Sequence, residues 1–282
     1  PGRRGGQRGN EPDAGAGDSA TAGHGPGSPG RGETRIGCVA LDQPDDGGGD
    51  RHRHRAYDLL PDRAGSAAVK LVILDGLLPA KKFGEVVQQF PAPPPAEGWH
   101  RNLHAHSNKW SKAELPKCLE HWLSDEMTQF VSNQLDIEPL YSDPTLKGGG
   151  CHVSTRGSYL DLHTDFLYHP ELKKRRAANA IFFVHPQWQH EWGGCLELWS
   201  SDRWHCEATI QPLPNRLVLF ETSDVSWHGH PEPMTVPEGV WRKSIAMYWY
   251  TDLYGDEDPT KSTNYQPRRC DRWRYFEVEK KA

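Results

Sequence analysis

Along most of the second half of the chain, hydrophobic and polar residues alternate in short runs that turn residues separate. This pattern begins at about Gly148 and is typical of β-strands rather than of helices. About eight strands with no helix between them indicate a mainly β fold, a double-sheet jelly-roll or barrel. The strands are expected at residues 150–154, 158–164, 178–185, 195–199, 206–211, 216–221, 225–229 and 241–251.

The region before these strands predicts one further strand and two supporting helices. Val69–Leu74 is an apolar run of strand length, and Pro79–Phe90 suits a short helix because a run of prolines follows it. From Glu114 to Leu135, apolar residues recur at steps of three and four, which predicts one amphipathic helix. Its apolar stripe is expected to pack on the sheet.

The two ends of the chain differ from this central region. Residues 1–66 are dense in Gly, Pro, Arg and Asp and contain no Phe, Trp or Lys. Such a stretch buries too little apolar surface to offset the entropy of ordering, so we expect a disordered tail. Residues 67–255 form the expected domain, and residues 256–282 a polar C-terminal extension.

Charge and cysteine usage exclude several classes of protein. The net charge of −5 argues against a nucleic-acid partner. No apolar run approaches the roughly 18 residues that cross a membrane, so no membrane partner is expected. The six cysteines form no CxxC pair, and no secretory signal is visible, although the chain begins without Met. We therefore expect an intracellular protein, cytoplasmic or nuclear, whose oligomeric state the sequence leaves open.

Candidate metal ligands lie one residue apart in His163-Thr164-Asp165. On a strand, His163 and Asp165 point to the same face, as ligands of one ion must. A third ligand is expected in the Trp-His-Gly-His-Pro segment, where His228 and His230 would both face inward on a regular strand. We favour His228, because the glycine and proline indicate that the strand ends here. Two histidines and one carboxylate predict a non-haem Fe(II) site with open positions.

A candidate anchor for an acidic co-substrate follows on the last strand. Arg242 and Ser244 are two residues apart, so both would point into the cavity, whereas Lys243 would face outward. A guanidinium group matches a carboxylate with two parallel hydrogen bonds, and a serine hydroxyl can add a third.

Several motifs occur together in an order that resembles Fe(II)/2-oxoglutarate-dependent oxygenases, of the branch related to prolyl 4-hydroxylases. The resemblance covers roughly residues 69–252 and is strongest over 148–252. The motifs are His163-Thr164-Asp165-Phe166, Trp192-Gly193-Gly194-Cys195-Leu196-Glu197-Leu198-Trp199, Pro214-Asn215-Arg216-Leu217-Val218-Leu219-Phe220-Glu221-Thr222, Trp227-His228-Gly229-His230-Pro231 and Arg242-Lys243-Ser244.

The resemblance implies a double-stranded β-helix, a form of jelly-roll, with His163, Asp165 and His228 as catalytic iron ligands. It implies Arg242 as the partner of the C5 carboxylate of 2-oxoglutarate. Such enzymes use Fe(II), 2-oxoglutarate and O2, and ascorbate is a candidate stimulant.

One position departs from the pattern of the prolyl-hydroxylase relatives. Phe183 stands where those relatives often have a tyrosine that touches the co-substrate, and a phenylalanine cannot donate that hydrogen bond. Ser244, His152 and Asn179 are the candidates to replace it.

The resemblance also implies an activity. We expect hydroxylation of an aliphatic C–H, in a prolyl or other peptidyl residue, with release of succinate and CO2. The presence of Asp165 favours hydroxylation over halogenation. A hydroxylase of small molecules (amino acids or natural products) and a non-catalytic, metal-binding jelly-roll module are the alternatives. The segment 167–176 is expected to be a loop over the mouth of the site that contributes to substrate selection.

Overall fold

All residues that the structure describes belong to one compact unit, Ile36–Ala282. In this computed structural model they are residues 53–59, 69–104, 107–253, 258 and 260–268. Most of the tail expected at residues 1–66 therefore lies outside the described residues.

The described part of the chain is mainly β, as the sequence predicts. Its helical elements are α1 (Ala80–Gln89), α2 (Asp125–Leu135) and the 3-10 helices η1 (Lys117–Leu123) and η2 (His190–Trp192). None of these helices is long and apolar enough to span a membrane. The strands are β1 (Arg53–Leu59), β2 (Val69–Asp75), β3 (His100–His104), β4 (Ser107–Lys112), β5 (Tyr141–Ser142), β6 (Gly150–Ser154), β7 (Leu160–Thr164), β8 (Tyr168–His169), β9 (Lys174–Phe183), β10 (Leu196–Trp199), β11 (Cys206–Ile210), β12 (Arg216–Glu221), β13 (Trp227–His230), β14 (Arg242–Thr251) and β15 (Asn264–Tyr265).

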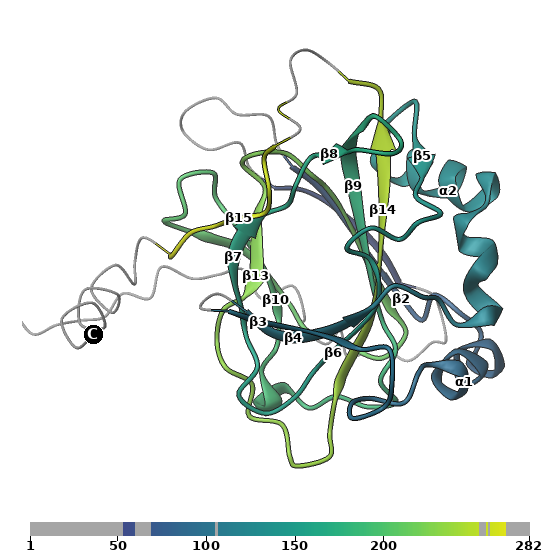
Figure 1. Ribbon diagram of the computed structural model, residues 1–282, viewed down its shortest axis with the longest axis vertical. Coiled ribbons are helices and arrows are strands. Elements are labelled where there is room, and N and C mark those ends of the chain that lie inside the picture. Colours follow the sequence, from purple (N-terminus) through teal and green to yellow (C-terminus); the bar gives the residue numbers. More distant parts are fainter. Residues whose placement is uncertain (1–52, 60–68, 105–106, 254–257, 259, 269–282) are drawn as a thin grey trace, which may run out of the picture. The chain divides into compact units, whose positions relative to one another are not determined.

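The strands form a curled antiparallel sheet that turns back on itself in two halves (Figure 1). One half has the order β2-β12-β9-β14-β6, and the other has the order β7-β13-β10-β11. Strand β4 lies between β6 and β7 and so joins the halves on one side. This arrangement is the expected double-stranded β-helix, whose interior lies between the two halves.

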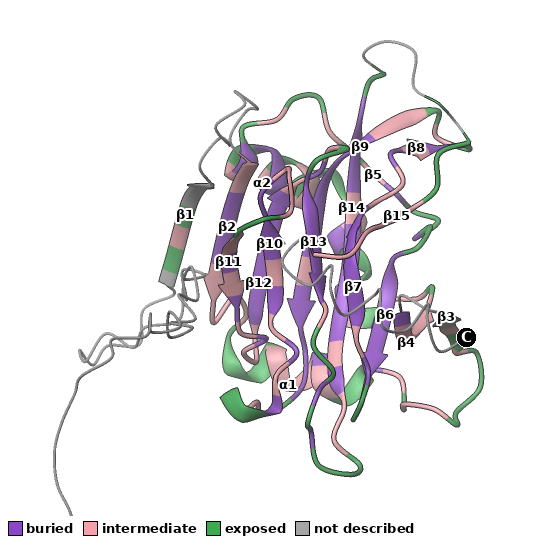
Figure 2. Cartoon of the chain, turned by 90° about the vertical axis from the view of Figure 1, so that its left-hand side faces the viewer, coloured by how far each residue is buried: buried purple, intermediate pink, exposed green. Residues whose placement is uncertain are grey.

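The helices cover the outer face of the first half of the sheet (Figure 1). Their apolar residues share one core with side chains of β9, β12 and β14, including Phe182, Leu217 and Ile245. Figure 2 shows strands β6, β7 and β13 buried along their length. Core packing on one face therefore leaves the opposite face of β9 and β14 free to line the interior.

The prediction of a single helix from Glu114 to Leu135 is wrong in one respect. The structure divides it at Ser124, which ends η1 and begins α2. The Ser124 hydroxyl accepts a hydrogen bond from the Met127 backbone N–H at 3.4 Å, so this residue caps the second helix. The apolar stripe itself is confirmed, because Leu119 of η1 and Val131 of α2 pack in the same core.

The prediction of a loop at residues 167–176 is also wrong, because much of this segment is a hairpin. Strand β8 pairs with the first residues of β9, which begins at Lys174 rather than at residue 178. Backbone pairing of β8 with β9 and burial order the segment. Arg176 is fully buried.

Three pairings had no counterpart in the sequence pattern. Strand β1 lies inside the stretch expected to be disordered, and it pairs with β2. The β3–β4 hairpin consists mostly of polar residues, and β15 lies in the expected C-terminal extension and pairs with β7. Backbone hydrogen bonds hold all three, and such pairing leaves little trace in hydrophobic periodicity.

Candidate metal centre

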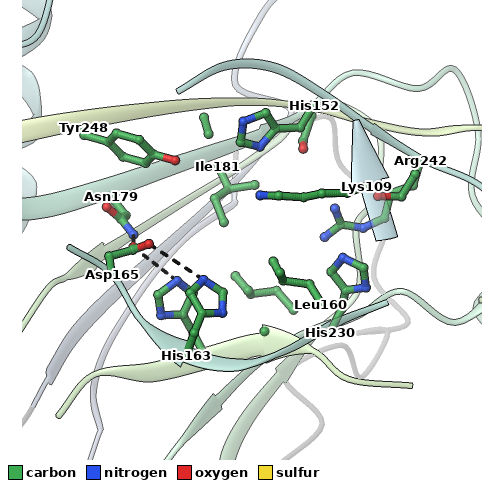
Figure 3. Close-up of a pocket in the computed structure, with 16 residues that line it drawn as sticks. Lys109, His152, Leu160, His163, Asp165, Asn179, Ile181, His230, Arg242 and Tyr248 are labelled. Atoms are coloured by element: carbon green, nitrogen blue, oxygen red, sulfur yellow. Dashed lines mark hydrogen bonds and ion pairs between the residues drawn. The ribbon is translucent and has the colours of Figure 1, made fainter. Parts of the chain in front are cut away.

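The structure brings His163, Asp165 and His228 together at one point of the interior. One possible ligand atom from each residue lies within 4.8 Å of the other two. His163 on β7 and His228 on β13 are register partners across the two strands. Asp165 follows β7, and its carboxylate oxygens lie 3.7 Å from His163 Nε2 and 3.4 Å from His228 Nε2 (Figure 3).

Backbone carbonyls fix both imidazole rings in the same way. His163 Nδ1 lies 2.9 Å from the Asp161 carbonyl oxygen, and His228 Nδ1 lies 2.9 Å from the Ser226 carbonyl oxygen. A carbonyl only accepts, so each Nδ1 carries the hydrogen and each Nε2 presents a lone pair to the centre. Burial, with a smaller effect of His228, lowers the pKa of His163 to about 3, so its ring is uncharged.

A buried arginine holds the carboxylate of Asp165. The Arg176 guanidinium lies 3.1 Å from Asp165 Oδ2, and the Asn179 amide donates to the same oxygen at 2.7 Å. Arg176 also donates to Asn179 Oδ1 at 2.7 Å and lies 3.3 Å from the centroid of the Tyr248 ring. Burial, the largest single effect, would raise the pKa of Asp165, but Arg176, His228 and His163 together lower that pKa well below its usual range. Two imidazoles and one carboxylate therefore converge, a donor set that fits Fe(II) with open positions.

Replacing Arg176 with methionine should lower the free energy of unfolding of the metal-free protein by about 3–5 kcal/mol, because it leaves the Asp165 charge buried without its partner. Chemical denaturation measures this change. The matched control is Arg175→Met, since the Asp224 partner of Arg175 is exposed and such pairs contribute less than about 1 kcal/mol. Equal losses in the two variants would contradict the positioning role of Arg176.

The structure places the two histidines of the Trp-His-Gly-His-Pro segment differently. The pairing of β13 with β7 is irregular between them, with His228 opposite His163 and His230 opposite Leu160. His228 joins the cluster, whereas His230 lies beside Arg242 (Figure 3). This arrangement favours the choice of His228, whose role as a ligand stays a prediction.

We expect His228→Ala to remove tight metal binding and turnover, because only two of the three ligands remain. His230→Ala should keep the metal and lose less activity. Metal content after dialysis, measured alongside turnover, distinguishes the two variants. The reverse order would make His230 the ligand.

Alternate residues of β14 line the pocket beside this cluster. Arg242, Ser244, Ala246 and Tyr248 face it, whereas Lys243 lies on the other side of the sheet, over Phe90. This is the alternation that the sequence predicts.

Arg242 is buried at the far side of this pocket. Its Nε donates to the Gly194 carbonyl oxygen at 2.9 Å, and its guanidinium carbon lies 4.8 Å from the Phe183 ring centroid. Burial lowers the pKa of Arg242 to about 10, so it remains a cation at neutral pH. Phe183 thus supports the guanidinium rather than facing the pocket, whose lining it does not join.

The three candidates to replace the missing tyrosine all line this pocket, but they are used differently. Ser244 and His152 are register partners on β14 and β6, beside Arg242. Asn179 instead forms hydrogen bonds with Asp165 and Arg176, as described above. Ser244 and His152 are therefore better placed than Asn179 to contact a ligand near Arg242.

Residues near the centre that sequence reasoning missed come from outside the expected strands. Lys109 enters from β4, and the Tyr265 ring on β15 lies 5.2 Å from the ring of His163. Tyr248, by contrast, lies on the expected strand 241–251, where the alternation from Arg242 places it on the pocket face. No pattern identifies Lys109 or Tyr265, because their strands are polar and short.

Comparison with known proteins adds to this geometry. Residues 149–251 match the family model of the 2OG-Fe(II) oxygenase superfamily. Prolyl 3-hydroxylase OGFOD1 of Mus musculus is 35% identical over 85 residues, 28% of this chain and 15% of that protein. Its Xenopus laevis counterpart is 27% identical over 157 residues, 54% of this chain and 28% of that protein. The chain therefore spans only a minor part of the relatives that it matches.

A prolyl-4-hydroxylase of Pseudomonas putida, known from a crystal structure, is 17% identical with a TM-score of 0.45, over 65% of this chain and 93% of the bacterial chain. The superfamily match itself spans β6 to β14 and includes the His-Asp-His cluster and Arg242. Residues 149–251 are therefore similar to the 2OG-Fe(II) oxygenase superfamily, whose members use Fe(II), 2-oxoglutarate and O2.

Proposed function

We propose that this chain is a 2-oxoglutarate-dependent dioxygenase that hydroxylates an aliphatic C–H of a prolyl or other peptidyl residue. The observation that carries the proposal is the pocket in which the His163, Asp165 and His228 cluster lies together with Arg242 and Ser244. Arg242 is buried and pairs with no carboxylate among the described residues. A non-catalytic binding module would not need such an arginine.

In this role, His163, Asp165 and His228 would hold Fe(II), and Arg242 with Ser244 would bind 2-oxoglutarate. When bound, the metal and the keto acid activate O2, so that one oxygen atom enters the substrate C–H, the other enters succinate, and CO2 leaves. The chain's own contribution is to orient these groups. Backbone carbonyls fix the two imidazoles, and Arg176 with Asn179 fixes the carboxylate.

Apolar side chains limit the access of water to the same pocket. Leu160, Ile181 and Leu196 line it from three different strands, β7, β9 and β10. Excluding water strengthens the electrostatic contacts of Arg242 and protects a reactive oxidant from side reactions.

The relatives described above, which are prolyl 3-hydroxylases, support the choice of a prolyl substrate. The chain covers a minor part of those proteins. A small-molecule hydroxylase remains the alternative from the same superfamily.

Substrate-stimulated formation of succinate tests the proposal. Purified protein with Fe(II), 2-oxoglutarate and ascorbate is incubated with a library of proline-containing peptides and, separately, with free amino acids. Stimulation by peptides, together with a mass increase of one oxygen atom on proline, is the expected result. Stimulation only by free amino acids would move the assignment to the small-molecule alternative.

A further inference from the structure

A lysine that the site described above does not use reaches into its pocket. Lys109 lies on β4, the strand that joins the two halves of the sheet between β6 and β7. Neighbouring residues on β4 pair with His152 of β6 and with Leu160 of β7, and both of these residues line the pocket as Lys109 does. Figure 3 shows the Lys109 side chain extending past Arg242 towards Ile181.

Charges in this pocket are unbalanced once the ion pairs within the chain are counted. Arg176 is paired with Asp165. Within the part of the chain that the structure describes, no carboxylate pairs with Lys109 or with Arg242, whose Nε binds only a backbone carbonyl. Two cations with no carboxylate partner therefore face one buried space, and burying such charges costs free energy that an anionic ligand offsets.

Two buried nitrogen atoms beside these cations also lack partners. His152 Nε2 and His230 Nδ1 are inaccessible to solvent and form no hydrogen bond within the described residues. Both histidines line the pocket, beside Lys109 and Arg242. Buried polar atoms without partners are rare in proteins and indicate a place that a ligand or water fills.

The two cations lie at different positions along the pocket. Arg242 is beside His230, away from the metal cluster, whereas the end of the Lys109 side chain is displaced towards the cluster (Figure 3). Burial lowers the pKa of Lys109 to about 8, and among the charged groups Asp165 acts on it more strongly than Arg242. In the view of Figure 3, the end of the Lys109 side chain lies between Asp165 and Arg242.

We propose that Lys109 is a binding residue for the keto-acid co-substrate and contacts the carboxylate at its metal end, while Arg242 contacts the distal carboxylate. This inference rests on the proposed function. It makes the pocket a site for a dianion with one cation for each carboxylate. Charged hydrogen bonds of this kind are among the stronger ones in proteins, so both contacts contribute to affinity.

Calorimetric titration of the Fe(II)-loaded protein without oxygen tests this assignment with two keto acids. One is 2-oxoglutarate, and the other is 2-oxopentanoate, which has the same carbon chain but no distal carboxylate. Lys109→Met keeps the length of the side chain and removes its charge. We expect it to raise the Kd of both acids by about 10- to 100-fold. Arg242→Met should raise the Kd of 2-oxoglutarate only.

The control is Lys112→Met, on the same strand but paired with Glu114 outside the pocket, and it should change neither Kd. Lys109→Arg should restore part of the affinity, which loss of packing alone would not explain. An unchanged Kd for 2-oxoglutarate in Lys109→Met would overturn the inference, as would an increase that disappears with 2-oxopentanoate. Failure of the unsubstituted protein to bind 2-oxoglutarate would instead reject the proposed function, and this inference with it.

Discussion

Replacing His163 with alanine is expected to reduce turnover by more than about 100-fold. This loss is larger than the one expected when a residue that only hydrogen-bonds to a metal ligand is removed. His163 presents the Nε2 lone pair to the cluster, and its ring contacts the ring of His228 with centroids 4.4 Å apart. Removing it leaves one imidazole and one carboxylate, which hold Fe(II) weakly. Succinate formation and bound iron, measured on the same sample, should fall together.

The control for this variant is His205→Ala, since His205 is an exposed histidine outside the pocket. Asp165→Ala should abolish turnover as well, but it would also leave the buried Arg176 charge without its partner. His163 therefore gives the cleaner test, because the imidazole is uncharged and its loss disturbs no ion pair within the chain. Normal turnover in His163→Ala would show that the metal site is assigned to the wrong residues.

Replacing Arg242 with alanine is expected to raise the concentration of 2-oxoglutarate required for half-maximal activity by about 10- to 100-fold. A hydrogen bond to a charged group contributes roughly 1.5–3 kcal/mol, which corresponds to that range. The effect should fall mainly on co-substrate affinity, because Arg242 is not one of the clustered metal ligands. Steady-state kinetics at several concentrations of 2-oxoglutarate separates this change from a change in the maximal rate.

Lys243→Ala is the matched control, because Lys243 adjoins Arg242 on β14 and points to the opposite face of the sheet. It removes one positive charge from the same strand without touching the pocket. A similar increase in both variants would mean that long-range charge, rather than contact with Arg242, determines the affinity for 2-oxoglutarate.

Strand periodicity predicted much of this site, because His163, Arg242 and Ser244 lie on strands. The alternation along β14 is sufficient to place Arg242 and Ser244 on the pocket face and Lys243 on the other. The spacing of His163 and Asp165 likewise predicted that both side chains face the interior. These predictions need only local backbone geometry, which the sequence pattern determines.

Other features depend on contacts that no local pattern contains. Arg176 stands in the segment expected to be a loop over the mouth of the site, yet it is buried against Asp165 because β8 and β9 pair. Lys109 lies on a polar strand that pairing with β3, β6 and β7 holds in place. Tyr265 reaches His163 from beyond the expected end of the domain at residue 255. Each of these contacts joins residues that are far apart in the sequence, through backbone pairing or an ion pair.

Titration of the purified protein with Fe(II) and then 2-oxoglutarate, without oxygen, tests the central claim most directly. If the cluster holds iron with open positions and the pocket beside it binds the keto acid, a weak visible absorption band at about 500–530 nm should appear only when both are present. Firmly retained zinc, or bound iron with no such band after 2-oxoglutarate is added, would contradict the account and favour a metal-binding module without this chemistry.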